Sequence, residues 1–197
     1  MLSILIAIPA CTFGQQVQLE QKYESRQGRW YLIPEVDLWF GNYTIAEVSP
    51  QIAYHITDRW SVGAGFNYNF YKEIETYYTA GYSTHLYGGR AFSRFAILTN
   101  AEEWLPVYLF SDLFIHLEYQ MMNLENRYFY APSYPDNGRF WTEQVYIGAG
   151  FTQKISQHSS YSFTLLWDIN SNIYSPYGNP VYRIGLNIYL GRREARQ

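Results

Sequence analysis

Apolar and polar residues alternate through the last strand-like stretch of the chain, residues 181–190. The even-numbered positions of this stretch are apolar, namely Tyr182, Ile184, Leu186, Ile188 and Leu190. The odd-numbered positions include a charged, a small and an amide residue, namely Arg183, Gly185 and Asn187. Successive side chains of a β-strand point to opposite faces of its sheet. The alternation therefore predicts a strand with one apolar and one polar face.

The same alternation returns in seven earlier segments, residues 29–40, 45–56, 61–71, 84–97, 107–121, 141–154 and 161–170. Each can cross a bilayer as a tilted strand, which takes roughly 9–11 residues. Aromatic residues make up 20% of the 197 residues and charged residues 16%, where ~25% charged is typical. Apolar side chains outside and polar ones inside are typical of a membrane barrel. We predict an all-β fold, an eight-stranded antiparallel up-and-down transmembrane β-barrel.

One proline lies within a predicted strand. Pro34 falls at an outward position of the first strand, near its seam with the last strand, where a proline is only conditionally tolerated because it cannot donate to the ladder.

The alternative fold is a soluble barrel of the lipocalin kind, which would bury its apolar face and expose its polar one. The polar face here carries six acids and three arginines, which favours the membrane barrel.

The connections between the predicted strands differ in length. Those after the second, fourth and sixth strands are short to medium, whereas residues 72–83, 122–140 and 172–180 form longer, aromatic loops, as on the outer surface of such barrels. We expect surface contacts from the rings of the first two, Tyr77, Tyr78, Tyr82, Tyr128, Phe129, Tyr130 and Tyr134, and from Tyr174 and Tyr177 of the third. The alternative is that many of these rings form the aromatic girdle at the membrane interface.

Charged residues on the polar faces predict the content of the lumen. The acids are Glu35, Asp37, Glu47, Asp112, Glu118 and Asp168, and the bases are Arg90, Arg94 and Arg183. Eight strands leave room for side chains but for no wide channel, so we interpret this set as a buried ion-pair network. A gated pore or proton path is the alternative.

Motifs for catalysis or metal binding are missing from the sequence. The four histidines, His55, His85, His116 and His158, fall on different strands or turns, without metal-ligand spacing. There is no G-x-S-x-G sequence and no phosphate-binding loop. We therefore predict no enzyme, no cofactor and no metal site; a Ser83–His85 pair near the rim is the alternative for a membrane-embedded enzyme. The net charge of -3 gives no reason to expect a nucleic-acid partner.

The N-terminus has the features of an export signal. Residues 1–14 combine an apolar run with small residues before a cleavage point, although no Lys or Arg precedes the run. Cys11 lies inside this segment; a lipoprotein site is the alternative, and Pro9 fits it poorly. We expect residues 1–14 to be a signal peptide, 15–27 a periplasmic lead-in, 28–191 the barrel and 192–197 a C-terminal tail.

Several stretches carry a family resemblance: residues 49–60, 92–95 and 166–170, together with 175–177 and the final strand. They resemble the small eight-stranded outer-membrane barrels of the OmpA and OmpX type, above all the barrel-only proteins of Bacteroidetes. The final strand resembles the family's assembly signal, with Arg183, Gly185, Ile188 and Leu190 at its positions. The resemblance implies a place in the bacterial outer membrane. It also implies the lipid bilayer and the barrel assembly machinery as partners. The aromatic loops add an unidentified extracellular ligand or protein as a further expected partner.

Overall fold

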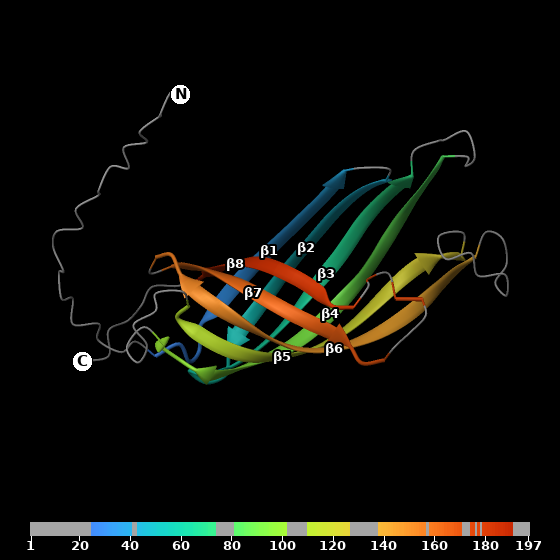
Figure 1. Ribbon diagram of the computed structural model, residues 1–197. Helices are drawn as coiled ribbons and strands as arrows, with labels where there is room; N and C mark the ends of the chain where they lie inside the picture. Colours follow the sequence, from blue (N-terminus) through green and yellow to red (C-terminus); the bar gives the residue numbers. More distant parts are fainter. Residues whose placement is uncertain are drawn as a thin grey trace, which may run out of the picture.

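The computed structural model describes residues 25–40, 43–73, 81–101, 110–126, 138–156, 158–170, 174–175, 177 and 179–190. The expected signal peptide, most of the lead-in and the C-terminal tail lie outside this part of the chain. Eight antiparallel strands form a closed barrel in chain order (Figure 1). They are β1 (Trp30–Phe40), β2 (Tyr43–His55), β3 (Trp60–Glu73), β4 (Tyr82–Leu98), β5 (Asp112–Glu125), β6 (Arg139–Lys154), β7 (Ser159–Asp168) and β8 (Val181–Tyr189). The predicted all-β, eight-stranded up-and-down barrel is confirmed.

Side chains of each strand alternate between a buried lumen and an exposed outer face. Along β5, for example, every second residue from Asp112 to Gln120 is buried and the residues between are exposed. The outer face carries large apolar side chains on all eight strands, with Ile184 of β8 reaching 71% exposure. The lumen is lined mainly by Ser, Thr, Asn, Gln and charged residues. The predicted inside and outside faces are therefore correct wherever the side chains are described.

The barrel has two different ends. At one end, called here the termini end, β1 begins and β8 finishes, and connections link β2 to β3, β4 to β5 and β6 to β7. At the other, called the loop end, lie the connections after β1, β3, β5 and β7. Strands β3 to β6 are longer than β7 and β8, so their hairpins project beyond the last two strands in Figure 1. Among the described residues no helix is long and apolar enough to cross a membrane.

The fifth strand lies further along the chain than predicted. We expected it over residues 107–121, but β5 spans Asp112–Glu125, and β6 begins at Arg139 rather than at Trp141. The ladder continues because Met122 and Leu124 are fully buried in the lumen, where they pack with Phe140. The two adjacent methionines at 121 and 122 conceal this continuation in the sequence, since they interrupt a simple apolar–polar alternation.

Two prolines weaken the barrel at defined places. Pro34 and Pro50 lie opposite each other in the β1–β2 ladder. The hydrogen bond from the Leu190 amide to the Trp30 carbonyl (2.8 Å) shows that even-numbered β1 residues direct their backbone groups toward β8. Pro34 belongs to that set and lacks an N–H. The β1–β8 register accordingly comprises Tyr31↔Tyr189 and Leu32↔Ile188, stopping just before Pro34.

Pro50 interrupts the pairing of β2 with β3 in the same way. The β2–β3 register passes from Val48↔Tyr68 to Gln51↔Gly65 and omits Pro50. The outward position of Pro34 at the seam is confirmed, and its physical consequence is a short closing ladder between the first and last strands.

Candidate functional site: the lumen

The lumen at the termini end is aromatic and apolar. Tyr31, Ile33, Ala53 and Phe92 form a buried cluster against which Tyr189 packs. The Phe92 ring fits over Gly63, where a Cβ atom would lie within 2.7 Å of the ring. Glycine is needed there because no larger residue leaves space for the ring, as expected for the inward glycines of β3.

An ionic cluster around Arg90 lies next to this layer, toward the loop end. The Arg90 guanidinium donates to Glu35 at 3.0 Å, to Asn67 at 2.6 Å and to Glu47 at 3.5 Å. Ser49 donates to the same Glu47 oxygen at 2.9 Å. The cluster joins β1, β2, β3 and β4, so it ties one half of the barrel together through side chains. Its charged members, Arg90, Glu35 and Glu47, all belong to the predicted set of lumen charges.

A second ionic cluster is centred on Glu118. Nη1 of Arg183 donates to both carboxylate oxygens of Glu118 at 2.6 and 2.7 Å, and Nη2 donates to Gln120 at 3.2 Å. Nε2 of His116 lies 3.1 Å from Glu118. Nε of Arg94 donates to Nδ1 of His116 at 3.0 Å. This second cluster links β8 to β5 and continues to β4.

The remaining predicted lumen charges have other partners. Asp112 receives two hydrogen bonds from Arg26, at 2.7 and 3.0 Å. Asp168 accepts from the Asn170 backbone amide at 2.9 Å and has no ion pair with a described residue. The side chain of Asp37 lies outside the described part. Arg26 is the partner that the sequence did not reveal, because it precedes the first strand and belongs to no alternating pattern.

The lumen at the loop end is again apolar. Leu86, Met122, Leu124 and Phe140 form a buried cluster, with Tyr174 and Tyr177 packed against it. The hydroxyl of Tyr177 donates to Glu47 at 3.1 Å. Burial and the negative charge of Glu47 raise the pKa of the Tyr177 phenol, so it remains a neutral donor.

The position of these two rings corrects the prediction that Tyr174 and Tyr177 are surface contacts. Both rings lie against the lumen core because Leu86 and Phe140 offer an apolar seat and Glu47 offers an acceptor. Tyr82 is the first residue of β4 rather than part of a loop, and its side chain is not described. The other predicted contacts, Tyr77, Tyr78, Tyr128, Phe129, Tyr130 and Tyr134, lie outside the described residues. Their role in recognition stays a prediction.

The suggested Ser83–His85 pair gains no support from the geometry. Nδ1 of His85 lies 2.7 Å from the Tyr68 hydroxyl on the outer face. Within the described ranges, no three His, Cys, Asp or Glu residues are grouped so that they could hold a metal ion.

Gly185, from the predicted assembly signal, lies at the weak seam. A Cβ atom there would come within 2.9 Å of Ile33 Cγ2, 3.2 Å of Ser162 Oγ and 3.4 Å of Glu35 Oε1. Glycine at this position lets the β1 side chains lie close over β8 although the backbone ladder has ended. Recognition of Arg183, Gly185, Ile188 and Leu190 by an assembly machinery stays a prediction.

The two ionic clusters place paired charges deep inside the lumen. Arg90, Glu35 and Glu118 are almost completely buried, Glu118 at 1% exposure. Burying charges is costly unless they are paired and hydrogen-bonded, and both conditions are met for Arg90, Glu35 and Glu118. Apolar layers lie at both ends of this ionic region. The arrangement can hold the strands in register.

Comparison with solved structures finds a similar β-barrel. The chain is similar to the N-terminal β-barrel domain of Pseudomonas aeruginosa OprF, with 11% sequence identity and a TM-score of 0.45, over 84% of this chain and 98% of that one. No protein-family model and no curated protein sequence matches the chain.

Proposed function

We propose that this protein is an integral barrel of the bacterial outer membrane that works as a rigid, sealed anchor for its loop-end segments. One observation carries the proposal: every strand exposes large apolar side chains outward around a charged, buried lumen. Soluble proteins rarely expose extended apolar surface. Hydrocarbon is the solvent in which that surface is stable. A closed barrel can enter it because its backbone groups pair between strands.

The packing of the described lumen side chains supports an anchoring role over transport. Ion pairs join β1 to β4 and β5 to β8 across the interior, while apolar clusters occupy both ends. Such packing stabilises a scaffold and opposes the passage of ions or solutes. Recognition then belongs to residues 74–80 and 127–137, whose tyrosines combine a large apolar area with a polar tip at a small entropic cost.

Cell fractionation and heat modifiability test the location. The mature chain is expected in the outer-membrane fraction, and its migration on a gel should differ before and after boiling because a closed barrel resists detergent unfolding. Recovery of a folded monomer in buffer without detergent would count against a membrane barrel and in favour of the lipocalin-like alternative.

Loop deletion and bilayer recordings test the role. Deletion of residues 128–136 should leave a heat-modifiable barrel and remove any surface phenotype of the intact protein. Wild-type protein in a planar bilayer should show no steady conductance. A stable conductance that changes with Arg90→Ala would show that the lumen is the working part and that the protein is a gated pore.

A further inference from the structure

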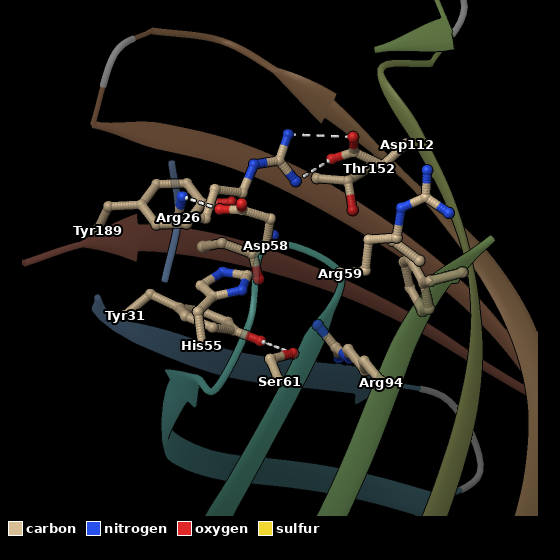
Figure 2. Close-up of a pocket in the computed structure, with 13 residues that line it drawn as sticks. Arg26, Tyr31, His55, Asp58, Arg59, Ser61, Arg94, Asp112, Thr152 and Tyr189 are labelled. Carbon is tan, nitrogen blue, oxygen red and sulfur yellow. Dashed lines mark hydrogen bonds and ion pairs between the residues drawn. The ribbon is translucent and has the colours of Figure 1, made fainter. Parts of the chain in front are cut away.

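A small cavity lies inside the barrel at the termini end, between the aromatic layer and the segment that precedes β1 (Figure 2). Its volume is about 40 Å³, enough for about three water-sized spheres. Figure 2 shows His55 and Arg94 on one side of the cavity and Asp112 and Thr152 on the other. The proposed function makes no use of this cavity.

Arg94 brings a buried positive charge to the cavity wall. It is 9% exposed, and its guanidinium stacks between Phe92 and Phe114, with its central carbon 4.9 and 5.1 Å from the ring centroids. Its Nε donates to Nδ1 of His116. The His116 ring can accept this bond as a neutral imidazole whose proton is on Nε2, the nitrogen that faces Glu118. Among the described residues no carboxylate forms an ion pair with Arg94. A buried cation without a counter-charge is costly.

His55 adds an unused polar group to the same wall. Its ring is 8% exposed and stacks near Tyr31 and Tyr189, with centroids 4.9 and 6.2 Å away. Neither ring nitrogen has a hydrogen-bond partner within the described part of the chain. A neutral imidazole always carries one N–H donor. Ser61 and Thr152 add hydroxyl groups to the lining, and a hydroxyl can turn its hydrogen toward an anion.

The acids at the cavity are already engaged. Asp112 is held by both terminal nitrogens of Arg26. Asp58 accepts from the Ser25 hydroxyl at 2.8 Å and from the backbone amides of residues 26 and 27 at 2.5 and 3.2 Å. Arg59 lies at the cavity rim. With three arginines and two aspartates, the lining carries an excess of positive charge.

We propose that this cavity binds a small inorganic anion of about the size of chloride, held by Arg94 and His55. Water alone fits the volume but leaves the charge of Arg94 without a counter-ion, whereas an anion supplies one and accepts the His55 N–H. The Arg26–Asp112 pair lines the same cavity, so binding of the ion stabilises the closed termini end.

Bromide, which scatters X-rays anomalously and is close to chloride in size, is the direct probe. Crystals of the detergent-solubilised full chain grown with sodium bromide should show an anomalous peak between Arg94 and His55. Absence of that peak while bromide is found elsewhere on the molecule would overturn the proposal and leave a cavity filled by water.

Unfolding in detergent gives an independent measure. Chloride should raise the urea midpoint relative to gluconate, an anion too large for the cavity, at equal ionic strength, because a ligand that binds only the folded state stabilises it. Arg94→Gln should weaken the apparent chloride affinity by about tenfold or more, equivalent to about 1.4 kcal/mol. His55→Phe keeps the stacked ring, removes the donor, and should also weaken it.

Lys72→Gln is the matched control, since it removes one exposed positive charge near the loop end. It should leave the chloride effect unchanged. An equal chloride effect in wild type, Arg94→Gln and His55→Phe would mean that the salt acts on the whole surface, and the proposed site would be wrong. If Arg94→Gln fails to fold, the wild-type bromide peak and the His55→Phe titration still decide the matter.

Discussion

Glu118 shows how one buried carboxylate depends on its neighbours. It is 1% exposed and lies between Arg183, which binds both of its oxygens, and His116. Glu118→Ala would leave Arg183 without its carboxylate in the same lumen layer. We expect a loss of about 3–5 kcal/mol in the free energy of unfolding, as is usual when one partner of a buried pair is removed. Urea titration of the barrel in lipid vesicles measures it.

A double variant distinguishes the contribution of the ion pair from the cost of leaving one charge unpaired. Replacing both partners, as Glu118→Met with Arg183→Met, removes the charges together and keeps the volume. Well-packed apolar replacements of buried ion pairs are often neutral or stabilising, so the double variant should be more stable than Glu118→Ala. If it is no more stable than the single variant, the loss in Glu118→Ala does not come from an unpaired Arg183 charge.

Ile147 tests the lipid-facing side of the same wall. It is 50% exposed near the middle of β6. Ile147→Arg should cost roughly 2–4 kcal/mol, the usual penalty for Arg at the bilayer midplane, whereas Ile155→Arg, in the turn after β6, should cost ~0–1 kcal/mol. Equal urea midpoints for the two variants would show that the outer face of β6 does not lie in hydrocarbon.

The burial of Gln144 removes it as a control for this experiment. The sequence places it in the lumen, and a polar lumen position would ordinarily tolerate an arginine. The structure shows it at 0% exposure, with its amide donating to Thr142 at 2.9 Å. An arginine there would have to displace packed neighbours, so Gln144→Arg is itself expected to destabilise the barrel.

At the scale of the strand, Pro34 limits how far β1 closes onto β8. Pro34→Val restores a backbone N–H that points to β8, opposite Leu186 in the continued register. We expect a longer β1–β8 ladder and a gain of about 0.5–1.5 kcal/mol, the usual net value of one hydrogen bond. Amide hydrogen exchange in the folded barrel measures this through slower exchange along β8.

Pro50→Val is the control for that variant. Its restored N–H points to β3 rather than to β8, so it should slow exchange in β3 and leave β8 unchanged. If Pro34→Val leaves β8 exchange as fast as in the wild type, another feature than the missing donor keeps the seam short.

Most strands could be predicted from the sequence because a half-buried strand must alternate. In β4, Arg90, Phe92 and Arg94 point inward between neighbours that are less buried, as expected from residue spacing alone. Alternation is a local signal, and it fails where the environment changes along the strand. In β5 the inward side chains change from polar to apolar near Met122. The alternation therefore does not predict residues 122–125, the part of the strand at the loop end.

Long-range contacts are the other part that the sequence did not reveal. Arg26 meets Asp112, and Tyr177 meets Glu47, across large separations in the chain. Neither residue lies in a repeating pattern, and each position is set by how the barrel closes. The same applies to the Arg94–His55 cavity, whose lining comes from the N-terminal segment and several strands.

At the scale of the whole molecule, the barrel is reversed relative to a soluble protein. Charged groups occupy the core and apolar groups the surface. This arrangement is stable only if the surrounding medium is apolar, because an exposed apolar belt favours association in water. The claim that the outer face lies in lipid is therefore central to both the proposed location and the anchoring role.

Trp167 allows that claim to be measured directly. It lies on the outer face of β7, 44% exposed, and pairs with Ile147 across the β6–β7 ladder. A variant that keeps Trp167 and replaces the other tryptophans with Phe should be refolded into vesicles whose lipids carry bromine at defined chain depths. We predict strong fluorescence quenching by bromines deep in the acyl chains, lost when urea unfolds the protein. Emission typical of water, unaffected by bromine at any depth, would contradict the account.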